Sequence, residues 1–392
     1  MKKIVLSIIS FINIFYPKDF KQVVFISSPD MSDNSFAFFK YMIENHSSKY
    51  VFIWLLEEKN NLLHYESMIK ENIIIDNITY SKIKFVSRNS IKGFYYYVSS
   101  KYIFFTHGFF TGMSLPKTQV RVNLWHGMPL KALGYLLNTK VIVPKTSYTF
   151  ATSKLFQGII SKVFNSPNES VLVVGQPRYD LFYTQNSILH KLDIDKNLYK
   201  QILFWAPTFR RAIGKDMKDG DFSDGLPIVG IDNLNNFNHY LKKLNIFLLI
   251  KLHPMDILNN HSFKKMTNIK VIRNKFLLDN NIQLYSLLSH VDILITDFSS
   301  IYIDFLLLDK PIIFLSDDFD SYENSRGFTF DNPKEYMPGE FVTTYKNLKI
   351  VIERLVIEKN DNYIAKRLEI RKLFHKYENN FSHRLYKLLD MQ

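Results

Sequence analysis

The chain has 392 residues, of which 46% are hydrophobic and 15% aromatic. This length predicts two domains, and the apolar content excludes a largely disordered protein. A formal net charge of +13 favours an anionic partner. Composition does not decide whether that partner is nucleic acid, anionic lipid or a phosphate-rich substrate. The absence of cysteine excludes a disulfide framework and thiolate metal sites.

The N-terminus comes nearest to a membrane-spanning sequence. Residues 4–16 read IVLSIISFINIFY, which is shorter than the ~20 apolar residues of a span and is not followed by a small-residue cleavage site. Basic residues flank this run at Lys2, Lys3, Lys18 and Lys21. We therefore expect residues 1–20 to form a membrane-interfacial segment, with an ordinary buried first helix as the alternative.

Short apolar runs rich in β-branched and aromatic residues recur along the chain, and each is continuous rather than alternating. Such runs are typical of strands that are covered on both faces. The predicted strands are 23–27, 51–55, 102–105, 120–124 and 171–174 in a first series, and 202–205, 247–251, 269–272, 291–296 and 311–315 in a second. Predicted helices lie between them, for example at 35–45, 282–289 and 300–308.

Alternation of strands and helices predicts an α/β protein with two parallel-sheet domains facing across a cleft. The expected boundaries place the first domain at 21–185, the second at 186–375 and a C-terminal helix at 376–392. In such folds ligands bind at the carboxyl ends of the strands, so polar residues there are the candidates for a site.

The first candidate motif is WHGMPLK at 125–131, directly after a predicted strand. His126 is a natural general base near neutral pH, Gly127 permits an unusual turn, and Lys131 can pair with phosphate. A packed loop histidine is the alternative. A His-Gly pair alone does not identify a site, because the same pair also occurs at His107 and Gly108.

Two further motifs each follow a strand of the second series. In APTFRR, Arg210 can hold phosphate oxygens in a bidentate manner, although arginines on a loop are also commonly solvated. In KLHP, His253 can contact a phosphate or protonate a leaving oxygen, with a structural role as the alternative.

The last two motifs are TDFSS and the acidic run that begins at residue 317. Ser299 and Ser300 fall at the start of a predicted helix, where hydroxyls and free N–H groups bind anions or simply cap the helix. Asp318 can bind ribose hydroxyls and Arg326 a phosphate, whereas a solvated loop is the alternative. The acidic run leaves Mg²⁺ possible, without a clear ligand set.

In this order and spacing, the motifs resemble those of the CDP-glycerol glycerophosphotransferases, the primases and polymerases of teichoic acids and related capsule polymers. The resemblance spans roughly residues 33–384 and includes Asp33-Asn34-Ser35, the segment 175–180 and Pro338-Gly339. It implies a GT-B-like fold with two Rossmann-like domains and peripheral attachment to the cytoplasmic face of a bacterial membrane. It also implies attack of an acceptor hydroxyl on the β-phosphate of CDP-glycerol with release of CMP.

The resemblance also implies roles for individual residues. His126 would activate the acceptor hydroxyl, and His253 would stabilise the transferred phosphate or assist the departure of CMP. Residues 21–185 would bind a lipid-linked or polymer acceptor, and residues 186–375 the CDP donor. The donor ligands would be Lys131 near the phosphates, Arg210, Ser299, Ser300 and Arg326 on the pyrophosphate, and Asp318 on the ribose.

Several alternatives stay open at this point. The motifs do not distinguish glycerol phosphate from ribitol phosphate, and the length fits a priming enzyme or a compact single-module transferase. A GT-B glycosyltransferase that uses a nucleotide sugar is the alternative enzyme. A basic binding protein without activity is disfavoured, and nucleic acid is not expected as a partner, because no dense basic stripe with interleaved aromatics is present.

Overall fold

The computed structural model describes residues 2–57, 61–108, 110–137, 143–184, 188–207, 226–252, 266–316, 319 and 327–391, with side chains from residue 9 onward. The chain divides into two compact units. Unit 1 comprises Met1–Met128, Leu133–Thr184 and His375–Gln392, and unit 2 comprises Pro129–Ala132 and Gln185–Phe374. The sequence WHGMPLK is thus divided, with His126 in unit 1 and Lys131 in unit 2.

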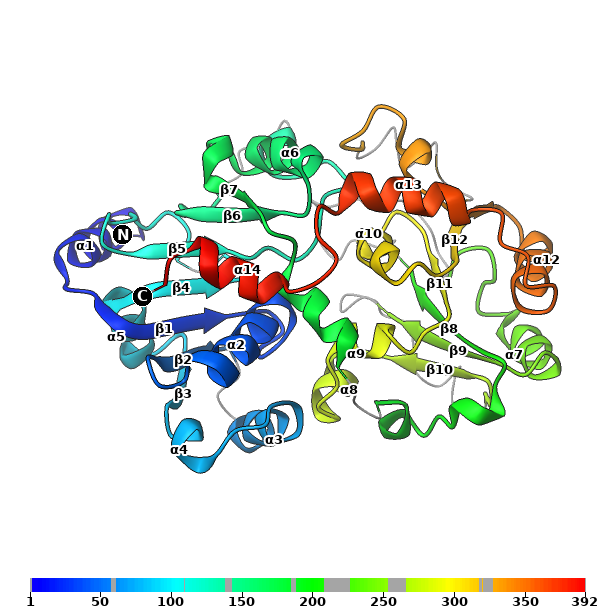
Figure 1. Cartoon of the computed structure of the whole chain (residues 1–392), viewed down its shortest axis with the longest axis horizontal. Helices are drawn as coiled ribbons and strands as arrows, with labels where there is room; N and C mark the ends of the chain where they lie inside the picture. The colour runs from blue at the N-terminus through cyan, green and yellow to red at the C-terminus, as the bar shows by residue number, and fades with distance from the viewer. Residues whose placement is uncertain are drawn as a thin grey trace. The chain divides into compact units, whose positions relative to one another are not determined.

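Unit 1 is built on a parallel sheet with the strand order β3-β2-β1-β4-β5-β6-β7 (Figure 1). The order reverses at the neighbours β1 and β4, as in doubly wound folds, and this is where such folds bind ligands. Its strands are β1 (Asp19–Ile26), β2 (Val51–Leu56), β3 (Ile83–Ser87), β4 (Ser100–Phe105), β5 (Val120–Asn123), β6 (Tyr148–Ala151) and β7 (Val171–Val173).

Helices cover both faces of this sheet. Val24 and Ile26 of β1 pack in one cluster with Tyr96 and Tyr97 of α5, whereas the intervening Phe25 packs against α2 with its ring centroid 5.5 Å from that of Phe39. This alternation follows from the two-residue period of a strand. The helices of unit 1 are α1 (Lys2–Phe15), α2 (Asp33–His46), α3 (Leu62–Asn72), α4 (Asn77–Tyr80), α5 (Ile91–Ser99), α6 (Lys154–Phe164) and α14 (Phe381–Leu388).

The C-terminal helix α14 packs beside α2 and the 3₁₀ segment η4 (Pro177–Tyr183), although it is far from both in sequence (Figure 1). The Asp180 carboxylate accepts the first free N–H groups of α14, from Phe381 at 3.0 Å and Ser382 at 2.8 Å. Gly175 has a φ of 82°, and a Cβ there would overlap the Phe381 ring. A glycine is therefore needed at this turn, which leads directly into η4.

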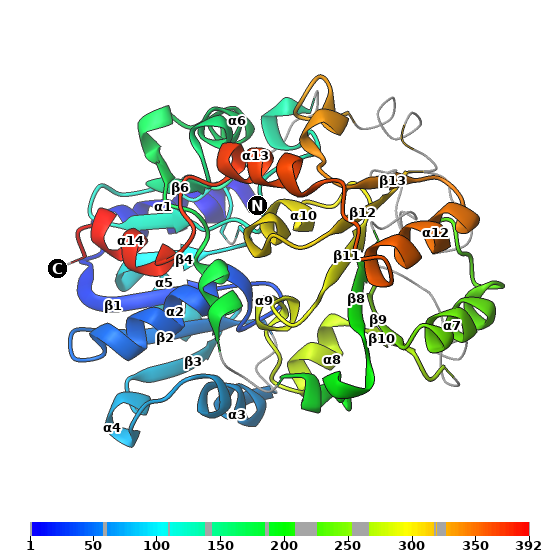
Figure 2. The ribbon, with the colours of Figure 1, turned by 45° about the vertical axis from the view of Figure 1, so that its right-hand side comes forward.

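Unit 2 repeats the same topology, with the parallel strand order β10-β9-β8-β11-β12-β13 (Figure 2). The order reverses at β8 and β11. The strands are β8 (Gln201–Ala206), β9 (Ile246–Lys251), β10 (Ile269–Ile272), β11 (Ile293–Thr296), β12 (Ile312–Leu315) and β13 (Glu340–Val342).

One face of the second sheet packs on α7 and α12, which lie side by side (Figure 2), and the Tyr240 hydroxyl of α7 donates to the Lys349 carbonyl of α12 at 2.7 Å. The other face includes Phe314, whose ring packs edge-on against Tyr302 of α10. The helices of unit 2 are α7 (Leu234–Lys243), α8 (Asn274–Asp279), α9 (Leu284–Leu288), α10 (Ile301–Phe305), α12 (Tyr345–Val356) and α13 (Ile364–Phe374).

The predicted fold class is confirmed, because both sheets are parallel and doubly wound. The ten strands that the apolar runs predict all form. Nine of them begin and end within two residues of the expected positions, whereas β1 begins four residues early, at Asp19. The expected N-terminal helix forms as α1. None of the helices in the described ranges combines the length and apolar character that a bilayer crossing requires.

Candidate functional site

The turn that carries His126 begins where β5 ends, at the carboxyl edge of the first sheet. The Leu124 N–H donates to the Phe105 carbonyl of β4 at 2.8 Å, and the chain then turns through Trp125, with φ of 51°, and Gly127, with φ of 147°. The prediction that Gly127 permits an unusual turn is confirmed, because few side chains tolerate such a φ. The turn places His126 beside the end of β4.

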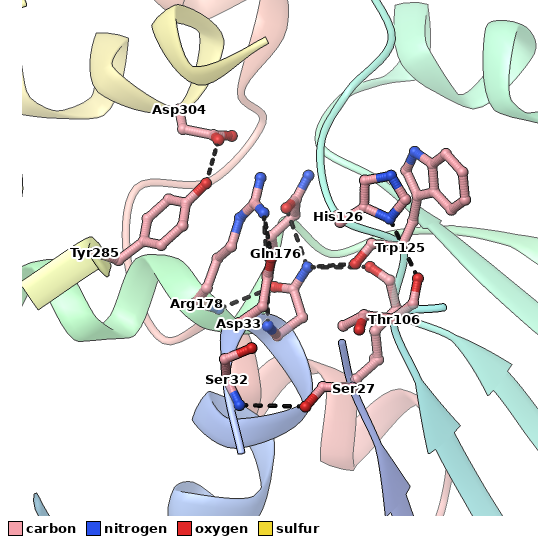
Figure 3. A network of polar contacts seen from close by, with 12 residues as sticks. Ser27, Ser32, Asp33, Thr106, Trp125, His126, Gln176, Arg178, Tyr285 and Asp304 are labelled. Atoms are coloured by element: carbon pink, nitrogen blue, oxygen red, sulfur yellow. Dashed lines mark hydrogen bonds and ion pairs between the residues drawn. The ribbon is translucent and has the colours of Figure 1, made fainter. Parts of the chain in front are cut away.

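The His126 imidazole is held by a hydrogen bond and by ring contacts (Figure 3). Its Nδ1 lies 3.3 Å from the Thr106 carbonyl oxygen, and because a carbonyl only accepts, Nδ1 carries the proton in this contact. Its ring centroid is 3.8 Å from that of Trp125 and 4.5 Å from that of His107. The Nε2 lone pair of the neutral ring is therefore left to accept a proton from another group.

Burial lowers the pKa of His126 to about 4. His107 and Arg178 act in the same direction, whereas Asp33 and the Thr106 carbonyl favour the charged ring and act against it. The imidazole is consequently neutral near pH 7, which is the form that a general base requires.

Asn34 connects the His126 turn to two other segments of unit 1. Its side-chain amide donates to the Leu124 carbonyl at 3.1 Å, to the Trp125 carbonyl at 3.0 Å and to Gln176 Oε1 at 3.2 Å. Its Oδ1 accepts the Arg178 backbone N–H at 3.0 Å. Asn34 is fully buried, so this one amide joins the start of α2, the His126 turn and the start of η4.

Arg178 adds a buried charge to the same region. Its side chain is 2% exposed, and its Nη1 lies 3.0 Å from both carboxylate oxygens of Asp33 (Figure 3). Removing one partner of such a pair leaves an uncompensated charge in a poorly solvated place. Sequence reasoning gives Asn34, Gln176 and Arg178 no role, although all three lie in segments that carry the family resemblance.

In unit 2, Ser299 and Ser300 lie where predicted, between β11 and α10. The Ser299 hydroxyl accepts the Ile301 N–H at 3.5 Å, whereas the Ser300 side chain makes no capping hydrogen bond. The Thr296 hydroxyl donates to the Ala206 carbonyl at 2.9 Å and so ties β11 to β8 at the point where the strand order reverses. Anion binding by the two serines stays a prediction.

The helix that follows these serines is fixed by a buried polar pair. The Tyr285 hydroxyl of α9 donates to Asp304 Oδ2 of α10 at 2.6 Å (Figure 3). Both side chains are shielded from solvent, Tyr285 at 6% and Asp304 at 1% exposure. The pair braces α9 against α10 and thereby holds the serine turn in place.

Lys131 pairs with the segment that follows Arg326 in sequence. It forms an antiparallel bridge with Phe328, and the Thr329 N–H donates to the Leu130 carbonyl at 2.9 Å. The Phe328 ring packs against Phe298 of the TDFSS motif, with 5.7 Å between centroids, and against Phe319 of the acidic segment, with 5.4 Å. Segments from three sequence motifs are therefore joined within unit 2.

Lys251 is a further basic group at the carboxyl edge of the second sheet, where it ends β9. Burial lowers the pKa of its amine to about 8. The other predicted site residues, His253, Arg210, Asp318 and Arg326, lie outside the described residues. The described ranges also contain no group of three or more His, Asp or Glu that could hold a metal ion.

Residues 8–390 match the protein family described as CDP-Glycerol:Poly(glycerophosphate) glycerophosphotransferase. The teichoic acid poly(glycerol phosphate) polymerase of Bacillus spizizenii is 27% identical over 373 residues, which cover 88% of this chain and 85% of that protein. The teichoic acid glycerol-phosphate primase of Bacillus subtilis is 31% identical over 267 residues, which cover 64% of each. A poly(ribitol-phosphate) polymerase of Bacillus spizizenii is 26% identical over 76% of this chain and 50% of its own length.

Solved structures agree on the fold. The wall teichoic acid polymerase TagF matches with a TM-score of 0.71 and 20% identity, covering 100% of this chain and 94% of that one. The UDP-GlcNAc 2-epimerase of Neisseria meningitidis matches with a TM-score of 0.55 and 12% identity, covering 95% of this chain and 100% of that one. The expected GT-B-like class is confirmed. Because the family match extends over nearly the whole chain, the protein belongs to the CDP-glycerol:poly(glycerophosphate) glycerophosphotransferase family.

Proposed function

We propose that this transferase moves glycerol phosphate, or a related alditol phosphate, from a CDP-activated donor to a hydroxyl acceptor in the synthesis of teichoic acid or a capsule-like polymer. The family match over residues 8–390 carries the proposal. Relatives named for glycerol phosphate and for ribitol phosphate both occur, so the proposal names the alditol as a class.

In the proposed step, the acceptor oxygen forms a bond to the β-phosphorus of the donor. The bond from that phosphorus to the bridging oxygen breaks, and CMP departs with the bridging oxygen. The proton of the acceptor hydroxyl passes to Nε2 of His126. The neutral ring and its hydrogen bond to Thr106 support this role, because they leave Nε2 with a free lone pair.

The remaining roles follow from the charge of the reaction. Charge spreads over the phosphoryl oxygens during transfer, so positioning and neutralisation supply most of the rate. We assign Lys131, Ser299 and Ser300 to the phosphates of the donor. Their location in unit 2 supports this assignment, whereas the roles of His253, Arg210, Asp318 and Arg326 rest on the sequence resemblance.

The test is a donor comparison with the full chain. The protein is incubated with CDP-glycerol, CDP-ribitol or a UDP- or GDP-sugar and with a lipid-linked alditol-phosphate acceptor, while CMP release and incorporation into the acceptor are measured together. We expect CMP and product in equal amounts with at least one CDP-alditol. Turnover with a nucleotide sugar alone would establish the glycosyltransferase alternative instead.

We further infer that the enzyme works as a peripheral protein at the cytoplasmic face of the cell membrane. Phe11 and Phe15 of α1 are 65% and 70% exposed, and Phe20 at the start of β1 is 63% exposed. Lys101 lies over the Phe20 ring, with its Nζ 5.1 Å from the ring centroid. Exposed aromatics beside basic groups favour binding to an anionic lipid surface.

Replacing Phe11 and Phe15 together by Ser is expected to weaken binding to vesicles that contain anionic lipid, because the two rings would no longer enter the interface. Binding is measured by co-sedimentation at low and high salt, and we expect salt to weaken the binding of the wild type. The matched control replaces Ile74 and Ile78, which are 96% and 74% exposed elsewhere in unit 1, by Ser. An equal loss of vesicle binding in both double variants would contradict a specific role of α1.

A further inference from the structure

Two imidazole rings lie face to face at the carboxyl end of β4. The centroids of His107 and His126 are 4.5 Å apart, and the ring planes differ by only 8°. A parallel arrangement at this distance is a direct stacking contact. The proposed reaction assigns a role to His126 and none to His107.

Thr106 contacts both rings. Its carbonyl oxygen accepts the Nδ1 proton of His126 at 3.3 Å, and its hydroxyl lies 3.0 Å from Nδ1 of His107. Thr106 is itself fully buried, and its N–H donates to the Ile26 carbonyl of β1 at 3.2 Å. The separation of the two rings is therefore set by the sheet, at the neighbouring strands where the order reverses.

The hydrogen bond to Thr106 restrains the His126 ring only weakly, because at 3.3 Å it is long and rotation about the Cβ–Cγ bond is soft. Trp125 contacts the His126 ring at a tilt of 33°, whereas His107 lies nearly parallel to it, and a ring stacked in this way opposes that rotation. We infer that His107 is a positioning residue for the transfer reaction, which holds the His126 ring so that Nε2 stays directed at the acceptor hydroxyl. The inference rests on the proposed function.

The electrostatic surroundings agree with this arrangement. The groups that influence His126 are His107 at the end of β4, Asp33 at the start of α2 and Arg178 in η4. Burial also lowers the pKa of His107, so neither ring is charged near pH 7 and the stack carries no charge repulsion. Removal of the His107 ring would admit water to His126 and remove a neighbour that opposes its protonation, so the pKa of His126 should rise from about 4 towards 6.5.

The experiment compares His107→Ala with His107→Phe in the full chain. The Ala variant loses the stack, and we expect kcat to fall roughly 10- to 100-fold, the cost of a misdirected catalytic group, with the KM for the CDP donor unchanged. The Phe variant keeps a flat ring in place, and we expect it to retain most of the wild-type kcat. As a matched control, His46 stacks on Tyr386 with 3.7 Å between centroids, and His46→Ala should leave kcat unchanged.

A second readout does not require activity. Histidine labelled with ¹³C at Cε1 reports the titration of each imidazole by NMR, and the signal that disappears in His126→Asn identifies His126. We expect the pKa of His126 to rise in His107→Ala and to stay low in His107→Phe. This titration does not depend on turnover, so it still tests the role of His107 if no CDP-alditol is used as a donor. Failure of the proposed function and failure of this inference can therefore be distinguished.

Three results would overturn the inference. One is wild-type kcat in His107→Ala. Another is an unchanged His126 titration in that variant. The third is a kcat for His107→Phe that is as low as that of His107→Ala, together with wild-type kcat in His107→Gln. That pattern would mean that His107 makes a polar contact with the substrate instead.

Discussion

Replacing His126 by Ala is expected to lower kcat for alditol-phosphate transfer by roughly 10²- to 10⁴-fold, the usual contribution of a general base. The physical reason is that the variant loses the Nε2 lone pair that we propose takes the acceptor proton, while the residues of unit 2 that we propose bind the donor are unchanged. The KM for the CDP donor should therefore change little. Steady-state CMP release at saturating donor measures the effect.

The control for this prediction is another histidine with a similar local contact. His239 lies exposed on α7, and its Nδ1 is 2.8 Å from the Asn235 carbonyl oxygen. His239→Ala should transfer at the wild-type rate. If His126→Ala retained more than a tenth of the wild-type kcat, a role for His126 as the base would be excluded.

The pH dependence of the wild type provides a second check on His126. Because burial lowers its pKa to about 4, the neutral ring predominates above that pH, and the ring becomes charged and unable to accept a proton only as the pH falls through that value. We expect kcat/KM, which reports the free enzyme, to show no loss due to this group between pH 7.5 and about 5.5. An ordinary imidazole would already be half protonated at pH 6.5.

Replacing Asn34 by Ala is expected to lower the free energy of unfolding by about 2–4 kcal/mol, because several buried polar groups lose their partner at once. The Leu124 and Trp125 carbonyls would lose a donor, and the Arg178 N–H would lose its acceptor. The His126 turn would also lose its attachment to α2, so kcat should fall as well. Chemical denaturation and the transfer assay measure the two effects on the same preparation.

Two further variants make the Asn34 prediction specific. Asn45 is exposed on the same helix and its side-chain amide donates to the Tyr41 carbonyl at 2.8 Å, so Asn45→Ala should cost no more than about 1 kcal/mol. Asn34→Asp keeps an acceptor for Arg178 but has no N–H group to donate, so it should be destabilised as strongly as Asn34→Ala. A stable and active Asn34→Asp protein would show that the donated hydrogen bonds do not hold the turn.

Three strands were not predicted from the sequence, and each departs from a continuous apolar run. β3 reads IKFVS and lies at the edge of its sheet, where Lys84 is exposed. β13 is a three-residue edge strand that begins with Glu340. β6 contains a buried Thr149 whose hydroxyl donates to the Asn123 carbonyl at 3.2 Å, and such pairing with a neighbouring strand cannot be recognised from the local pattern.

The sequence by itself determined the α/β class, ten of the described strands, the family and the placement of His126, Ser299 and Ser300 after strands, because apolar runs and ordered motifs are local properties of the chain. Only the tertiary structure decided which groups surround His126. Asn34 is 90 residues from Leu124 and 144 from Arg178, and His107 meets His126 because β4 and β5 are neighbours in the sheet. These contacts, and the low pKa of His126, depend on strand order and burial, which are properties of the packed chain as a whole.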